Sequence, residues 1–367
     1  MRRRFFHVVI LLLFCVLLYL LFLDKGSEKL RPQEGSLLPS PIPTPDPSQV
    51  VVLRDNRLTY HLNYQDFEAE FPFLQHYKCR MLVCKEDLCW SSGGRPLLLL
   101  AIKSQPSSFK RRVAIRKTWA TEREISGYLV RQVMLMAISP QKLHMNLVEE
   151  EAKIYQDILL WDFEESHSNL SLKERCFLEW LHHNCQEAQF IFKGDDDEFV
   201  NPEALVRYLR ETASGSLAIH GNIQTKSPTV RSGKYKVSAS LFPYKLYPYF
   251  PSGGGFIMPQ ATIPALYNAT LWMPVFPLDD VYFGFLGLAA RVTYHHDDRF
   301  YVLGLPYVPC YFRDALVVHG IPPGSLVLIW QDLQRVLHCD SVCPFFHSSV
   351  FLVLILSLLL IGLSTIL

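Results

Sequence analysis

The chain has 367 residues, of which 36 are Lys or Arg and 35 are Asp or Glu, so its formal net charge at pH 7 is +1. This balance argues against broad electrostatic capture of nucleic acid, and we expect no nucleic-acid partner. Hydrophobic residues make up 49% of the chain and charged residues 19%, which excludes wholesale disorder. The length suits one large α/β domain or two smaller ones with appended segments.

The N-terminal end predicts a membrane anchor. Residues 1–4 contain three arginines, and residues 5–23 form an apolar run without a charge. Such a run nearly crosses a hydrocarbon core of about 30 Å, and the arginines favour a cytoplasmic N-terminus. We therefore expect a cytoplasmic tail over 1–4, a signal-anchor over 5–23 that contacts membrane lipid, and a lumenal remainder. A cleaved signal peptide is the alternative, but the run does not end at the small residues of a cleavage site.

Two further segments flank the expected lumenal domain, which we place at residues 61–340. Prolines alternate with small and polar residues after the anchor, which predicts an extended stem over residues 24–60. Residues 345–367 are mostly apolar and long enough to cross a membrane. A lipid-anchor signal and a buried tail helix are the alternatives for this last segment.

Cysteines and glycosylation sequons agree with a lumenal location. The chain has nine Cys, one of which, Cys15, lies in the first apolar run, so eight remain for oxidised pairs. Their spacing does not determine the pairing. Asn169 and Asn268 each begin an Asn-X-Ser/Thr sequon, so both are candidate glycosylation sites.

The domain alternates between strand and helix signals. An apolar run at 96–102 predicts a buried parallel strand, and the alternation continues from there. The expected strands are 96–102, 130–138, 157–163 and 189–193. Three expected helices span 111–119, 147–155 and 281–290. Two more are expected from their first residues: one is capped by Ser171, with Glu174 in a capping box, and one is opened by Pro202. This alternation predicts a single, mostly parallel sheet flanked by helices, with ligands beyond the carboxyl ends of its strands.

Three consecutive carboxylates, Asp195, Asp196 and Asp197, follow one of these expected strands directly after a Gly. Adjacent carboxylates repel one another unless a cation lies between them. Oxygen ligands suit Mg²⁺ or Mn²⁺, and such ions complete their shell with phosphate oxygens and water. The triplet therefore predicts a metal site that holds a nucleotide diphosphate, whereas a solvated acidic turn is the alternative.

Six segments in this order resemble the motifs of the β-1,3-glycosyltransferase family (glycosyltransferase family 31), which includes β-1,3-galactosyltransferases and β-1,3-N-acetylglucosaminyltransferases. The segments are 97–119 (with RVAIRKTW), 157–173, 193–202 (KGDDDEFVNP), 251–256 (PSGGGF), 278–284 (LDDVYFG) and 317–320 (VVHG). The resemblance covers about residues 79–334. The form of the 193–202 motif is closest to the N-acetylglucosaminyl branch.

The resemblance implies a GT-A type glycosyltransferase fold and an inverting transfer reaction. The expected activity moves N-acetylglucosamine from UDP-GlcNAc, in β-1,3 linkage, onto galactose-terminated glycans of glycoproteins or glycolipids. The expected cofactor is Mn²⁺ or another divalent cation, and the expected location is the Golgi membrane, with a type II topology. Two alternatives remain: a β-1,3-galactosyltransferase that uses UDP-galactose, and a non-catalytic lumenal binding protein of the same fold.

The resemblance also implies roles for the metal and donor site. Asp197 falls at the position of the direct metal ligand, and His319 at that of a second ligand near the diphosphate. Asp196 falls where the family contacts the ribose and a metal-bound water, and Asp195 is expected to shape the donor pocket. A buried core histidine is the alternative for His319.

Further residues are carried over in the same way. An inverting transfer needs one general base, and Asp280 is the candidate, although Asp279 beside it leaves the choice open. Both could instead cap the helix that follows. The remaining expected donor contacts are Gly254, Gly255, Arg112 and Arg116, with a turn as the alternative for the glycines and a solvated helix face for the arginines.

Overall fold

A computed structural model describes residues 50–85, 87–91, 94–212 and 217–335. The expected cytoplasmic tail, signal-anchor and hydrophobic C-terminal segment lie outside these residues. Within them, no helix combines the length and the apolar character that a bilayer crossing requires. The expected stem reaches too far along the chain, because β1 (Val50–Arg54) and β2 (Thr59–Asn63) already form an antiparallel hairpin with Tyr60 fully buried.

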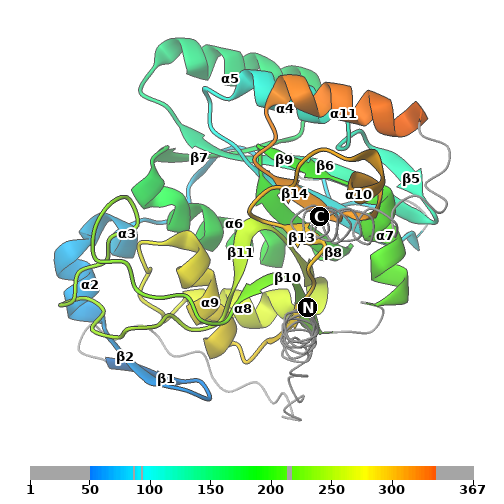
Figure 1. The fold of residues 1–367 in the computed structure, drawn as a ribbon. Helices are drawn as coiled ribbons and strands as arrows, with labels where there is room; N and C mark the ends of the chain where they lie inside the picture. Colours follow the sequence, from blue (N-terminus) through cyan, green and yellow to red (C-terminus); the bar gives the residue numbers. More distant parts are fainter. Residues whose placement is uncertain (1–49, 86, 92–93, 213–216, 336–367) are drawn as a thin grey trace, which may run out of the picture. The chain divides into compact units, whose positions relative to one another are not determined.

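Four parallel strands form the centre of the main sheet (Figure 1). They are β8 (Ala188–Asp195), β4 (Leu97–Lys103), β6 (Tyr128–Ile138) and β7 (Ile158–Glu164), in that spatial order. Every residue of β4 is buried, which confirms the strand expected from its continuous apolar run. Because the four strands run in one direction, their carboxyl ends meet at one edge of the sheet.

Antiparallel strands extend this parallel centre. Next to β8 lies β11 (Phe250–Pro259), followed by β10 (Ala218–Gln224), and both pairings are antiparallel. Beyond β10 lies β12 (Thr293–His296), in a parallel pairing. The opposite side carries β3 (Met81–Val83), antiparallel to β7, and β5 (Arg123–Ile125), antiparallel to β6.

Helices cover both faces of the sheet, as the alternating pattern predicted (Figure 1). Successive residues of β4 point to opposite faces, so Leu98, Leu100 and Ile102 pack in one core while Leu97 and Leu99 pack in the other. The first core is covered by α4 (Phe109–Arg116), α5 (Lys142–Tyr155), α7 (Pro202–Glu211) and α11 (Pro323–Arg335). The second is covered by α6 (Leu170–Asn184), α8 (Ile263–Thr270) and α9 (Asp279–Ala289).

The start of α6 differs from the expected capping box. Asn169 occupies the N-cap position, and Ser171 lies inside the helix. Glu174 is buried and forms an ion pair with Lys193 of β8, with 2.5 Å between Oε1 and Nζ. A tertiary partner in the sheet therefore binds the carboxylate that local sequence assigned to the helix end.

A small second sheet lies beside the end of β8. It consists of β13 (Phe300–Tyr301), β14 (Val317–His319) and β9 (Glu198–Val200). In the antiparallel pairing of β14 with β9, His319 stands opposite Glu198. This register brings a histidine from late in the chain next to the acidic triplet. The remaining elements are α2 (Tyr64–Glu70), α3 (Pro72–His76), α10 (Pro309–Asp314), and the short 3₁₀ helices η3 (His167–Asn169) and η4 (Gln260–Thr262).

Two disulfides tie the N-terminal part of the domain to the end and the middle of α6. Cys79 pairs with Cys176, and Cys89 pairs with Cys185. These pairs join segments 97 and 96 residues apart in the sequence. Cys310 is also disulfide-bonded. The expectation of oxidised cysteine pairs is confirmed for these residues.

Candidate active site

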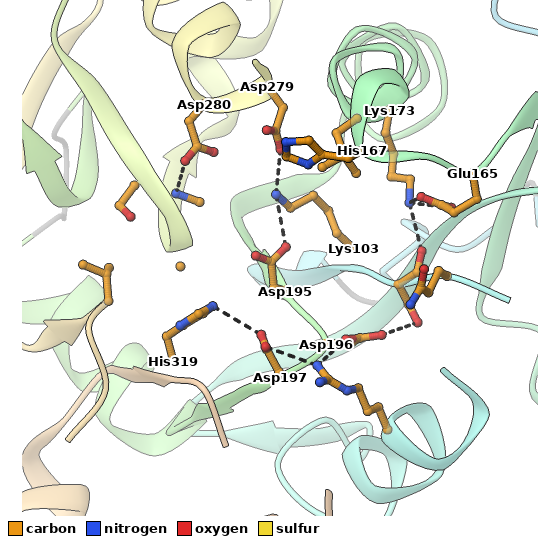
Figure 2. Close-up of a pocket in the computed structure, with 18 of the residues that line it drawn as sticks. Lys103, Glu165, His167, Lys173, Asp195, Asp196, Asp197, Asp279, Asp280 and His319 are labelled. Atoms are coloured by element: carbon orange, nitrogen blue, oxygen red, sulfur yellow. Dashed lines mark hydrogen bonds and ion pairs between the residues drawn. The ribbon is translucent and has the colours of Figure 1, made fainter. Parts of the chain in front are cut away.

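A polar cavity of about 510 Å³ lies at the carboxyl ends of β4 and β8 (Figure 2). The acidic triplet enters it from the end of β8, His319 from β14, and Asp279 and Asp280 from the start of α9. These residues are separated by up to 124 positions in sequence, counting from Asp195 to His319. The structure therefore brings the predicted metal residues and the predicted base into one cavity, at the edge of the sheet where parallel strands bind ligands.

Asp195, Asp197 and His319 form a set of side chains able to hold a metal ion. One ligand atom from each residue lies within 4.8 Å of the other two. His319 Nε2 is 3.4 Å from Asp197 Oδ1. Two carboxylates and one imidazole, with open space on the cavity side, fit a divalent cation such as Mn²⁺ that also binds phosphate oxygens. The residues predicted for the metal, Asp197 and His319, thus lie together.

Asp196 lines the cavity but points away from this set. It accepts a hydrogen bond from Ser104 Oγ at 2.7 Å and one from Arg111 Nη1 at 3.0 Å. Burial raises the pKa of its carboxyl above the usual value. The middle carboxylate of the triplet therefore faces Ser104 and Arg111, while Asp195 joins Asp197 and His319.

The two arginines expected at the donor lie elsewhere. Arg112 is 0% exposed and donates from Nε and Nη2 to Glu151 of α5 at 2.9 and 2.6 Å. Arg116 pairs with Glu151 and Asp157, so both guanidinium groups hold α4 against its neighbours. The arginine in the cavity is Arg111, which bridges Asp196 and Asp197. The expectation for Arg112 and Arg116 was wrong, because Glu151, a residue distant in sequence, binds both of them. Arg111 is left to face the cavity.

Lys103 links the triplet to the second acidic pair, and the sequence analysis did not identify it. Its Nζ lies 3.1 Å from Asp195 Oδ1 and 2.9 Å from Asp279 Oδ2, and the side chain is 7% exposed. Figure 2 shows this ammonium between the two carboxylates. One signal was available in the sequence, because a lysine that ends an otherwise apolar buried strand needs a charged partner.

Asp279 and Asp280 are neighbours with different surroundings. Burial and, next to it, the charge of Asp279 raise the pKa of Asp280 to about 7, and Gly253 N–H donates to its Oδ2 at 3.0 Å. Burial also acts to raise the pKa of Asp279, but the ammonium of Lys103 outweighs it and the pKa falls to about 2. At neutral pH, Asp279 is therefore ionised and held by Lys103, whereas Asp280 exchanges a proton.

The glycines lie within β11, so the alternative interpretation as a turn is wrong. Gly253 and Gly254 line the cavity, and a Cβ on Gly253 would lie 2.5 Å from Asp280 Oδ1. Gly255 is not among the lining residues. Its φ is +102°, and an added Cβ would lie 3.0 Å from Val317. Gly255 therefore allows the close packing of β11 on β14, and the expectation that it contacts the donor is not supported.

The two sequons differ in exposure. Asn268 is exposed on α8, and Asn169 is half-buried with its amide donating to the carbonyl of Glu164. Glycosylation at either position stays a prediction.

The far wall of the cavity was not anticipated. It is made of Glu165, His167, Leu170, Lys173, Lys234 and Tyr235. Lys173 is almost fully buried and donates to Glu165 and to the carbonyl of Ser104. Glu165 and His167 come from the β7–α6 connection, Leu170 and Lys173 from the start of α6, and Lys234 and Tyr235 from the long connection between β10 and β11. The first four lie within the segment 157–173 that resembles a family motif, whereas Lys234 and Tyr235 lie outside every such segment.

Comparison with known proteins shows the family of the chain. A family model described as Galactosyltransferase matches residues 110–298. The chain is 34% identical, over 73% of its length and 72% of the relative, to the Homo sapiens UDP-GlcNAc:betaGal beta-1,3-N-acetylglucosaminyltransferase 9. It is 36% identical, over 73% of its length and 75% of the relative, to a Homo sapiens acetylgalactosaminyl-O-glycosyl-glycoprotein beta-1,3-N-acetylglucosaminyltransferase. It is 31% identical, over 88% of its length and 92% of the relative, to the Homo sapiens N-acetyllactosaminide beta-1,3-N-acetylglucosaminyltransferase 3. The chain therefore belongs to the Galactosyltransferase family, together with these β-1,3-N-acetylglucosaminyltransferases.

Proposed function

We propose that this protein transfers N-acetylglucosamine from UDP-GlcNAc, in β-1,3 linkage, onto galactose-terminated glycans of glycoproteins or glycolipids. The printed names of the similar proteins support the sugar, the linkage and the enzyme class. The parallel sheet with an acidic triplet at the end of β8 supports a GT-A type domain.

The main support for this proposal is that one cavity contains two chemically different groups of acidic residues. Asp195 and Asp197 lie with a histidine, as a cation site requires, while Asp280 has a pKa of about 7, near that of an effective general base. An inverting transfer uses both functions in a single displacement, without a covalent intermediate. A binding protein of the same fold would have no need for a carboxylate with a raised pKa at this place.

Each charged residue has a role in the proposed reaction. Asp197 and His319, with Asp195, would hold the divalent cation, which when bound stabilises the negative charge that grows on the departing UDP. Asp280 takes the proton of the acceptor 3-hydroxyl as the new bond forms to the sugar C1. Lys103 keeps Asp279 ionised and fixed beside it.

Arg111 is the remaining cation of the donor side. It lies against Asp196 and Asp197, and its side chain is 37% exposed, so it can also reach a phosphate oxygen.

A donor screen tests the proposal. The full-length protein in detergent is incubated with lactose as acceptor and with UDP-GlcNAc or UDP-galactose, in Mn²⁺ or in chelator. We expect transfer from UDP-GlcNAc in Mn²⁺ alone, with a β-1,3 linkage in the product by NMR. Transfer only from UDP-galactose would favour the galactosyltransferase alternative. Binding of both substrates without transfer from any donor would favour a non-catalytic protein.

We further propose that the protein resides in the Golgi membrane as a single-pass type II protein. The arginines before the apolar run at 5–23 favour this orientation. The disulfides Cys79–Cys176 and Cys89–Cys185 agree with an oxidising compartment. Exposed Asn268 provides the test: its sequon should carry a glycan if the domain is lumenal, and an Asn268→Gln variant should then migrate faster on a gel.

A further inference from the structure

We propose that Tyr235 and His167 form the subsite for the acceptor sugar, with Tyr235 as a stacking platform for a terminal galactose ring. This inference rests on the proposed function and assigns the far wall of the same cavity. Both residues line the cavity, and their rings meet edge to face with centroids 5.3 Å apart.

The direction of the reaction places the acceptor at this wall. The set of Asp195, Asp197 and His319 marks the diphosphate end of the donor. In an inverting displacement the acceptor hydroxyl attacks the sugar C1 from the side opposite the departing diphosphate, and the general base lies on that side. Figure 2 shows His167 beside Asp279, across Lys103 from Asp195, and the charge of Asp279 acts on the His167 ring. His167 therefore lies on the side of the acidic pair Asp279–Asp280 and away from the metal residues, and we assign its wall to the acceptor.

Tyr235 is exposed, yet its backbone is held in place. Its side chain is 51% exposed, although aromatic rings usually lie against other groups. The turn that carries it is closed by the hydrogen bond from Val237 N to Val230 O, 2.9 Å. Arg231 donates to four backbone carbonyls of this connection, those of Val237, Ser238, Phe242 and Tyr244. An aromatic ring presented on a fixed turn at the rim of a polar cavity suits the C–H face of a pyranose.

His167 supplies the polar part of the subsite. Burial, followed by the nearby Lys234, lowers the pKa of its imidazole, so the ring is neutral at pH 7. Its Nε2 is screened from solvent and has no hydrogen-bond partner in the described part of the chain. Leaving such an atom unsatisfied is unfavourable, and a sugar hydroxyl can satisfy it by donating or accepting. Access for the hydroxyl to this screened atom requires a rotation of the exposed Tyr235 ring, which packs edge to face on His167.

Steady-state kinetics of the full-length protein test this subsite, with UDP-GlcNAc as donor and lactose as acceptor. Tyr235→Ala should raise the KM for lactose about tenfold, the size of one lost aromatic contact, while the KM for UDP-GlcNAc stays unchanged. Tyr235→Phe keeps the ring and should retain the wild-type KM for lactose. His167→Phe keeps a ring but loses Nε2, and should raise the KM for lactose. Lys236→Ala, on the same turn but outside the cavity lining, is the matched control.

An unchanged KM for lactose in both Tyr235→Ala and His167→Phe would overturn the inference. So would a raised KM for UDP-GlcNAc, since this wall would then hold the donor sugar. Lactose binding by saturation-transfer NMR, in UDP and Mn²⁺, separates this result from a failure of the proposed function. If the wild-type protein binds lactose without transferring N-acetylglucosamine, and Tyr235→Ala weakens that binding, the acceptor subsite stands and the donor assignment falls.

Discussion

Asp279 and Asp280 show how neighbouring identical residues acquire different chemistry. Both begin α9, where carboxylates are favoured by the helix dipole, so their position in the helix does not separate them. Lys103 reaches Asp279, and the backbone of β11 reaches Asp280. The result is one permanently charged carboxylate and one with a pKa of about 7. The sequence left open which residue is the base, and these contacts favour Asp280.

The pH dependence of the reaction follows from this difference. The base acts in its ionised form, so kcat/KM should rise with pH and level off above the Asp280 pKa of about 7. Asp279→Asn removes a negative neighbour that raises this pKa, and should move the rise to lower pH. Lys103→Met removes a positive neighbour, and should move the rise to higher pH. If both variants keep the wild-type pH profile, Asp280 is not the titrating base.

Substitution of the two acidic groups should separate binding from chemistry. Asp280→Asn is expected to stop transfer while UDP still binds in Mn²⁺, because it removes only the proton acceptor. Asp197→Ala is expected to abolish both transfer and Mn²⁺-dependent UDP binding, because it removes a ligand of the predicted cation. Isothermal titration calorimetry with UDP, with and without Mn²⁺, distinguishes the two. Normal turnover by Asp280→Asn would make Asp279 the candidate base.

At the scale of the element, neighbouring arginines of α4 have different roles: one holds the helix against α5 and the other faces the cavity. Arg112 points into the interface with α5, and Arg111, one residue earlier, points into the cavity. One residue corresponds to a rotation of about 100° around the helix axis, so neighbours face different surroundings. The sequence identified the helix correctly, but it assigned the donor contact to the buried arginines.

The two neighbouring arginines should therefore give opposite phenotypes. Arg112→Met leaves a charge of Glu151 without its bidentate partner, and we expect a loss of about 3 kcal/mol in the free energy of unfolding. Arg111→Met should leave stability nearly unchanged and raise the KM for UDP-GlcNAc. Thermal unfolding and steady-state kinetics on both variants provide the comparison. A destabilised Arg111→Met with a normal donor KM would show that Arg111 has a structural role instead.

At the scale of the whole molecule, the disulfides fasten the N-terminal segment to α6 beneath the sheet. Each closes a loop of nearly a hundred residues, 97 for Cys79–Cys176 and 96 for Cys89–Cys185. Cross-links over long loops restrict the unfolded chain most strongly. They therefore stabilise the face of the sheet on which α6 and α9 pack.

Removal of one disulfide should destabilise the domain without altering the site. We expect the double variant Cys89→Ala, Cys185→Ala to lose about 2–5 kcal/mol of folding free energy. Its donor KM at low temperature should stay that of the wild type, because neither cysteine lines the cavity. Thermal unfolding with and without reductant measures the first effect. A wild-type melting temperature in the double variant would mean that this cross-link contributes little to stability.

The amino-acid sequence by itself determined which segments form the central strands and which residue types are available for the expected chemistry. Apolar runs such as 96–102 identified the central strands, because a buried parallel strand tolerates few polar side chains. The triplet Asp195–Asp197 predicted a cation site, because adjacent carboxylates require a counter-charge. These signals depend on short-range order along the chain.

Only the tertiary structure decided which distant residues meet. The partner of Asp279 lies 176 positions away at Lys103, and that of Arg112 lies on another helix at Glu151. The cavity wall joins His167, from the segment 157–173, with Tyr235, from a connection without a sequence motif. Ion pairing, burial and the resulting pKa values depend on distances in space, and a single sequence carries no record of those distances.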